Sequence, residues 1–177
     1  LISLAGPANK QGRIAADNIC GIPSTYRGSQ GSSVIKVFDI TAASTGVNET
    51  VAKAAGLAVD HVILSPMSHA GYYPGGKLMT MKVVFEKETY RLLGAQIVGY
   101  EGVDKRIDVL ATAIFAGLRA TELKDLDLAY APPYSSAKDP VNMAGFMIEN
   151  IAHGILKQWH LADADTLTRD GSVTLLD

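Results

Sequence analysis

Cysteine is nearly absent from this chain of 177 residues, in which Cys20 is the only one. A single cysteine excludes an internal disulfide, a CxxC redox pair and a thiolate zinc site within one chain. So low a cysteine content suits a reducing compartment, and we therefore expect a cytoplasmic protein. Cys20 lies on the apolar side of a predicted helix, near its C-terminal end, and we expect it to be a small core residue.

Charge of one sign and long apolar runs are also missing. The net charge is −2 and no run of like charge is long enough for an interaction tail. We therefore expect neither a nucleic-acid partner nor binding to an acidic membrane surface. No segment approaches the roughly 20 apolar residues that cross a bilayer, and no basic region precedes the apolar start, as a signal peptide requires. Because the chain lacks an initiating Met, we expect it to be a piece of a longer protein.

Catalytic motifs are lacking as well. The segment 71–76 holds three glycines, but their spacing is wrong for a phosphate-binding loop and no Lys-Ser/Thr pair follows. A GxSxG nucleophile elbow does not occur. The histidines match no metal-ligand spacing, so we expect no metal site and interpret each as a surface or hydrogen-bonded residue: His61, His69, His153 and His160. The residues alone indicate a soluble α+β module without a complete catalytic group.

Apolar periodicity divides the chain into helices and strands. Six apolar residues between Ile107 and Leu118 recur at helical spacing, and Asn48 is a favourable N-cap. We predict helices over 7–21, 49–55, 107–118 and 141–153, a short helical piece over 121–125, and strands over 34–38, 59–64, 78–85 and 91–100. The last two strands are separated by a short turn, which indicates antiparallel pairing. Grouped strands with helices on one face predict an α+β fold with an antiparallel sheet of about four strands.

Three prolines stand in the eleven residues 130–140, which read Tyr-Ala-Pro-Pro-Tyr-Ser-Ser-Ala-Lys-Asp-Pro. Each proline fixes its φ angle, removes a backbone donor and pushes its predecessor toward extended geometry. A loop this stiff holds a side chain in place at low entropic cost, and two tyrosines, Tyr130 and Tyr134, bracket the Pro-Pro pair. Two interpretations are open at this point: a rigid connector with packed tyrosines, or a loop that faces a ligand or a partner.

Five motifs in order resemble parts of the pyridine nucleotide-disulfide oxidoreductases. Residues 4–18 (Leu-Ala-Gly-Pro-Ala-Asn-Lys-Gln-Gly-Arg-Ile-Ala-Ala-Asp-Asn) resemble the last helix of their FAD domain. The other four motifs resemble their C-terminal dimerisation domain and comprise residues 69–75, 93–96, 102–108 and the proline loop. The closest branch is that of the coenzyme A-disulfide reductases with related NADH oxidases and persulfide reductases.

The resemblance implies three parts of the chain. Residues 1–24 would be a remnant of the FAD-binding domain, residues 25–153 the dimerisation domain, and residues 154–177 a linker with the start of a truncated domain. A strand is expected at the very end, over 173–177, where Leu-Leu-Asp is similar to the first strand of a rhodanese domain. A form fused to a rhodanese is thus one possible parent.

The resemblance further implies that the parent protein binds FAD and NAD(P)H. Its nucleotide-binding glycines and its redox-active cysteine would lie upstream, so this chain alone should bind no cofactor and be inactive. Pro7, Ala8 and Asn9 would face the pyrimidine edge of the flavin, because free N–H groups and the positive end of a helix dipole stabilise charge there.

A homodimer is also implied, with the proline loop closing the active site of the partner subunit. In this branch two tyrosines donate hydroxyls toward the sulfur of a coenzyme A-type thiol or disulfide, and they match Tyr134 and either Tyr73 or Tyr72. A phenol can stabilise a developing thiolate by hydrogen bonding or proton donation, but Tyr134 could instead only pack at the interface. Two alternatives are an NADH oxidase or peroxidase of the same architecture and a purely structural interaction module. One stripe of the last helix would be buried against the twin subunit: Val141, Ile148 and Ile151.

Overall fold

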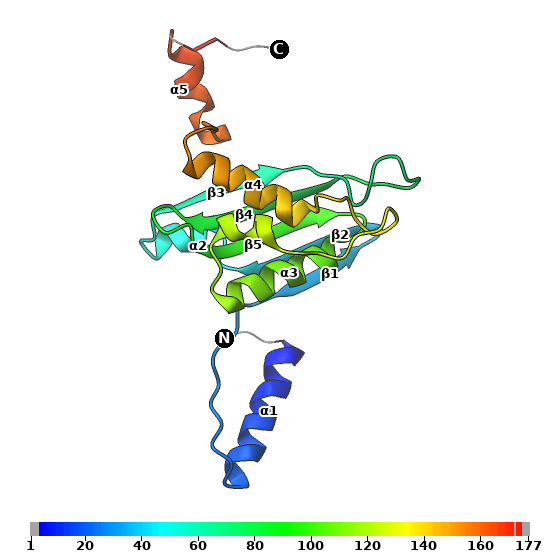
Figure 1. Ribbon diagram of the computed structural model, residues 1–177. Helices are drawn as coiled ribbons and strands as arrows, with labels where there is room; N and C mark the ends of the chain where they lie inside the picture. Colours follow the sequence, from blue (N-terminus) through cyan, green and yellow to red (C-terminus); the bar gives the residue numbers. More distant parts are fainter. Residues whose placement is uncertain (1–3, 172, 175–177) are drawn as a thin grey trace.

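The computed structural model describes residues 4–171 and 173–174. A five-stranded antiparallel sheet in the order β1-β2-β5-β4-β3 forms its centre, and Figure 1 shows helices α3 and α4 lying across one face of it. The strands are β1 (Ser33–Val37), β2 (Ile40–Gly46), β3 (Val59–Leu64), β4 (Met79–Glu86) and β5 (Leu92–Gly99). The predicted α+β class, the antiparallel sheet and the one-sided helices are confirmed, with one strand more than expected.

Strand β2 is the strand of the sheet that the sequence pattern does not predict. Four of the seven residues in its sequence, Ile-Thr-Ala-Ala-Ser-Thr-Gly, are Ala, Ser or Gly, which have little intrinsic preference for a strand. The strand forms because it pairs along its whole length with β1 on one side and with β5 on the other. At its end the backbones come so close that a Cβ on Gly94 would lie 2.0 Å from the carbonyl oxygen of Val47, so glycine is required there.

The hydrophobic core lies between the sheet and the helices α3 (Val103–Ala116) and α4 (Pro140–Ala152). Side chains such as Ile97 of β5 and Leu110 of α3 are fully buried in it. Val141 and Ile148 of α4 are also fully buried within this core, and Ile151 packs against it. The expectation that this stripe packs against a twin subunit is therefore wrong, because the chain's own sheet already covers it.

Two short helical elements complete the domain as expected. Helix α2 (Glu49–Ala54) begins at Asn48, whose side chain accepts a hydrogen bond from the amide of Val51 at 2.9 Å. The 3-10 helix η1 (Ala120–Asp125) packs across α4. A Cβ on Gly145 of α4 would lie 2.3 Å from the backbone nitrogen of Lys124, so this glycine allows the close approach of the two backbones.

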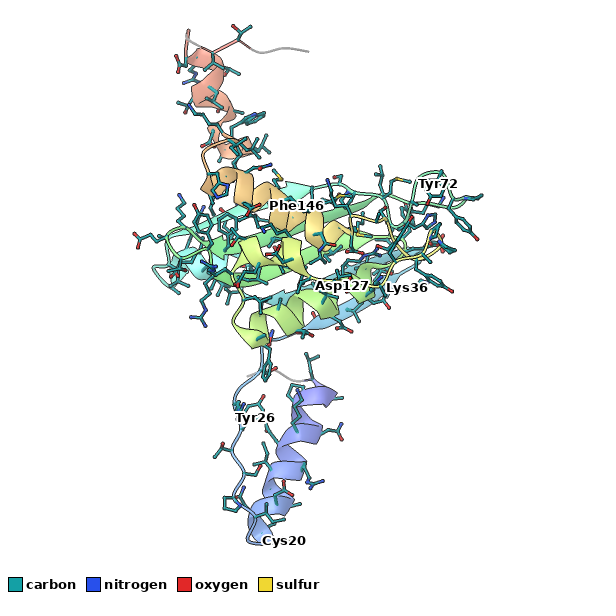
Figure 2. The ribbon with its side chains drawn as sticks, viewed as in Figure 1. Cys20, Tyr26, Lys36, Tyr72, Asp127 and Phe146 are labelled. Atoms are coloured by element: carbon teal, nitrogen blue, oxygen red, sulfur yellow. The ribbon has the colours of Figure 1, made fainter. Side chains whose placement is uncertain are left out.

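Helix α1 (Ala5–Ile19) extends away from the sheet, as Figure 1 shows. Within the described part of the chain none of its side chains is buried. Cys20 caps its C-terminal end and is exposed, and Figure 2 shows this residue at the tip of α1, far from the sheet. The expectation of a core cysteine is wrong, because the apolar side of α1 has no partner in this chain.

The segment after α4 contains two further elements, η2 (Leu161–Asp163) and α5 (Ala164–Arg169). Val173 and Thr174 belong to no strand, and residues 175–177 lie outside the described residues, so the rhodanese-like strand stays a prediction. Across the residues that the structure describes, no helix has both the length and the apolar character for a membrane crossing.

Candidate functional site

The two tyrosine-bearing loops lie side by side at one end of the sheet. The first loop connects β3 to β4, and the second is the proline loop that precedes α4. The amide of Ala70 donates to the carbonyl of Ser135 at 3.0 Å, and the hydroxyls of Tyr72 and Tyr130 lie 2.8 Å apart. Figure 2 shows Tyr72 at the outer tip of this end of the molecule. The fold thus brings together two segments that are about 60 residues apart in the sequence.

A buried arginine joins the two loops to the core. Arg106 of α3 is 1% exposed, and its Nη2 donates to the carbonyl of Ser68 at 2.9 Å and to Ser135 Oγ at 3.1 Å. The same nitrogen lies 2.9 Å from Asp139 Oδ2. Since Ser68 lies in the first loop and Ser135 in the second, one side chain fixes both loops relative to α3. A buried charge requires such a set of partners.

Asp139 is the centre of this network on the side of α4. Its carboxylate accepts from the hydroxyl of Ser135 at 2.5 Å and from the amide of Val141 at 3.0 Å, which makes it the N-cap of α4. Pro140 follows at the first helical position, which suits its fixed φ angle. Burial opposes the charge of Asp139, but the hydrogen bonds from Arg106, Ser135 and Val141 outweigh it and hold the pKa of this carboxyl below its usual value of 3.8.

The three predicted tyrosines differ in their surroundings. Tyr134 is 72% exposed and Tyr72 is 75% exposed, whereas Tyr73 is 43% exposed. The ring of Tyr73 packs edge-on against His69 at 5.6 Å. The hydroxyl of Tyr72 already has a partner in Tyr130, a residue to which the sequence pattern assigns no such role. All three rings therefore lie on surface loops that a rigid network holds from below.

A cavity of about 540 Å³ opens between the two loops and the start of α3. Most of its wall is apolar, and its polar groups include Lys105 and His69. The ammonium of Lys105 donates to the carbonyl of Ala129 at 3.3 Å, and Tyr134 forms part of the rim. A mostly apolar hollow with a few directed polar groups is the usual form of a small-molecule site.

The three residues expected near the flavin lie in α1, away from the tyrosine loops. Pro7, Ala8 and Asn9 are in the first turn of α1, and Figure 1 shows that this helix lies well away from the tyrosine loops. This first turn has no acidic residue and no side-chain cap, and it opens toward the sheet onto a pocket that Tyr26, Arg27 and Phe115 also line (Figure 1). Within one chain, this turn does not meet the tyrosines (Figure 1).

The comparison with protein families decides the identity of the fold. Residues 32–141 match the model of the "Pyridine nucleotide-disulphide oxidoreductase, dimerisation domain". The chain belongs to this family. The matched range begins just before β1 and ends at the start of α4, so it contains the whole sheet and both tyrosine loops.

Relatives of known name agree with this assignment. A coenzyme A disulfide reductase of Staphylococcus epidermidis is 38% identical over 146 residues, which are 82% of this chain and 33% of that protein. The structure of reduced CoADR-RHD from Bacillus anthracis superposes with a TM-score of 0.93 at 47% identity and covers 97% of this chain and 31% of that one. A NAD-dependent persulfide reductase from A. fulgidus gives a TM-score of 0.82 at 47% identity, over 85% and 28% of the two chains. This chain spans about a third of the length of these relatives.

The network of Arg106, Asp139 and Ser135 beneath the tyrosine loops was not among the features predicted from the sequence. A signal for it exists, since Arg106 lies three residues after Val103 and four before Leu110, on the buried stripe of α3. A charged residue on an apolar stripe predicts a buried partner. The partner, Asp139, is 33 residues away, and no periodicity points to it.

The histidines also end up in different places. His69 is buried within the first tyrosine loop, and His153 is exposed at the end of α4. His61 of β3 and His160 of the C-terminal segment stack on one another with their ring centroids 4.0 Å apart. The sequence separates these two histidines by 99 residues, which is why they match no metal-ligand spacing.

Proposed function

We propose that this chain is the dimerisation domain of an FAD- and NAD(P)H-dependent reductase that acts on coenzyme A disulfide or a related persulfide. The parent enzyme is a homodimer, and the tyrosine loops of each subunit complete the active site of the other. The observation that carries the proposal is that Arg106 hydrogen-bonds to both loops and holds them in one rigid unit, while the rings of Tyr134 and Tyr72 remain exposed. The similarity to coenzyme A disulfide and persulfide reductases supports the same substrate class.

The proposed role of the tyrosines is to stabilise or protonate a thiolate. Cleavage of a disulfide leaves one sulfur as a thiolate, and a phenol within hydrogen-bond distance can stabilise that charge or protonate it. The flavin supplies the electrons in such an enzyme. Tyr134 and Tyr73 are our first choice of donors, with Tyr72 as the alternative, because the hydroxyl of Tyr72 is engaged by Tyr130. A rigid loop presents these hydroxyls at low entropic cost.

The role proposed for α1 follows from its N-terminal turn, which has no side-chain cap. Pro7, Ala8 and Asn9 would lie at the electron-rich edge of the flavin, where the positive end of the helix dipole stabilises charge. Pro7 has no N–H group and the amide of Ala8 donates to the carbonyl of Leu4 at 3.2 Å, so the dipole would act there rather than hydrogen bonds from these two residues. The side chain of Asn9 donates to the carbonyl of Ala5 at 2.9 Å, so it steadies the turn. This assignment also accounts for a helix whose side chains find no core within this chain.

Phenylalanine substitutions in the parent reductase test the proposal. Tyr134→Phe and Tyr73→Phe remove only a hydroxyl, and we expect each to lower kcat for disulfide turnover by roughly 10- to 100-fold. The dimer should persist in light scattering, because no apolar area is lost. Tyr90→Phe is a matched control, since Tyr90 lies in the turn between β4 and β5, at the other end of the sheet from the loop between β3 and β4, and it should turn over like the wild type.

The outcome separates two classes of function. If the Phe variants of Tyr134, Tyr73 and Tyr72 all keep wild-type turnover and the dimer is intact, the domain is an interaction module only. If the chain stays a monomer at high concentration in light scattering, the proposed homodimer is wrong.

A further inference from the structure

The C-terminal segment returns to the edge of the sheet and contacts β3 there. The side-chain amide of Gln158 donates to the carbonyl of His61 at 3.0 Å, and the Nε2 atom of His160 lies 2.9 Å from Asp60 Oδ1. The rings of His160 and His61 are stacked, with an angle of 21° between their planes. In Figure 1, β3 is the edge strand on the side where the chain leaves α4 for α5.

This contact gathers three groups of the kind that bind metal ions. Asp60, His61 and His160 each offer one ligand atom, and these atoms all lie within 4.8 Å of one another. We propose that the three residues form a binding site for a divalent transition-metal ion, with Zn²⁺ as the ion that the donor set suits best. Two imidazole nitrogens and one carboxylate oxygen are ligands that Zn²⁺ prefers, and three protein ligands leave one position for water.

Binding requires the three ligand atoms to close around the ion. Zinc–nitrogen bonds of about 2.1 Å place two neighbouring ligand atoms roughly 3.4 Å apart in a tetrahedral site. Separations of up to 4.8 Å therefore have to shrink by up to about 1.4 Å. Asp60 and His61 are held in β3. The ring of His160, which is stacked on His61, has to turn so that both in-plane lone pairs meet at the ion.

A second carboxylate stands behind the site. The Nδ1 atom of His61 lies 3.2 Å from a carboxylate oxygen of Glu49 of α2. Such a carboxylate behind a histidine is the usual support of a metal ligand. Lys53 and Lys82 pair with Glu49, and the nearby positive charge leads us to expect a dissociation constant in the micromolar range rather than a tighter one.

An ion at this place would fasten the C-terminal segment to the domain. His160 comes about 100 residues after Asp60, so the ion closes a long loop of chain. The segment beyond residue 157 would thereby be held against β3, so protection of this segment from proteolysis is a second measure of zinc binding. The proposal does not depend on the function of the tyrosine loops.

Calorimetric titration of the metal-free 177-residue chain with ZnCl₂ tests the site. We expect one zinc ion per chain, and we expect Asp60→Asn and His160→Gln to weaken binding at least tenfold. His153→Ala is the matched control, because His153 is an exposed histidine at the end of α4, and it should bind zinc like the wild type. Substitution of His160 removes no buried side chain, so a folding defect does not mask the result, and circular dichroism checks this.

Limited trypsin digestion gives an independent measurement at Lys157, which is exposed. Zinc should slow cleavage there several-fold in the wild type and in His153→Ala, and should have no effect in His160→Gln. The proposal is overturned if the wild type takes up no zinc, or if Asp60→Asn and His160→Gln bind zinc as the wild type does.

Discussion

The guanidinium of Arg106 and the carboxylate of Asp139 lie 2.9 Å apart beneath the tyrosine loops, with side-chain exposures of 1% and 3%. Arg106 comes from the first helix of the core and Asp139 from the cap of the last one. Their contact therefore joins α3, α4 and both loops in one place. Because both side chains are buried, removal of either one leaves the other as an unpaired buried charge, which is strongly destabilising.

Arg106→Met tests the energy of this pair. We expect the free energy of unfolding to fall by about 3–5 kcal/mol, because the substitution leaves the carboxylate of Asp139 buried without its cation. Urea unfolding measures the change. Arg119→Met is the control, since the pair of Arg119 with Glu122 is largely exposed and its loss should cost about 0–1 kcal/mol. Equal effects of the two substitutions would contradict the structural role of Arg106.

The acid stability of the domain should depend on Asp139. Its pKa is lowered in the folded chain, so ionised Asp139 stabilises the fold fully above its unfolded value of about 3.8, and this stabilisation disappears as the pH falls through the lower folded value. The stability of Asp139→Asn should therefore approach that of the wild type as the pH drops below about 4. Urea midpoints of the two proteins between pH 7 and pH 2 measure the difference. A difference that stays constant over this range would rule out a lowered pKa.

Gly145→Ala should disturb the contact between α4 and η1. A Cβ there would lie 2.3 Å from the backbone nitrogen of Lys124, and backbone cannot yield as a flexible side chain does. We expect a loss of about 1–3 kcal/mol in thermal or urea unfolding, as for other overpacked sites. Gly12→Ala is the matched helix control, because a Cβ on Gly12 meets no atom within 4 Å, and it should cause no loss of stability.

Much of the domain could be predicted from local patterns. The stripe from Ile107 to Leu118 predicts α3 because apolar residues at helical spacing must face a core. Asn48 predicts the start of α2 because its side chain satisfies a free amide of the first turn. The proline loop was recognisable as a stiff segment before a helix. Each of these features depends on residues that are close in the sequence.

Other features depended on contacts that no local pattern contains. Strand β2 exists because β5 and β1 pair with it, although its own small residues do not favour a strand. Val141 and Ile148 have the pattern of an apolar stripe, but only the packed structure shows that the chain's own sheet covers it. Cys20 has the neighbours of a core residue, yet its helix finds no partner surface here.

The sequence by itself determined where four of the helices, four of the five strands and the stiff proline loop form, and its motifs indicated the family, because both are properties of neighbouring residues. The tertiary structure decided which distant side chains meet: Arg106 with Asp139, Tyr72 with Tyr130, and His61 with His160. These pairs lie from 33 to 99 residues apart in the chain, so only the packing of sheet against helices, driven by burial of the core, could bring them together.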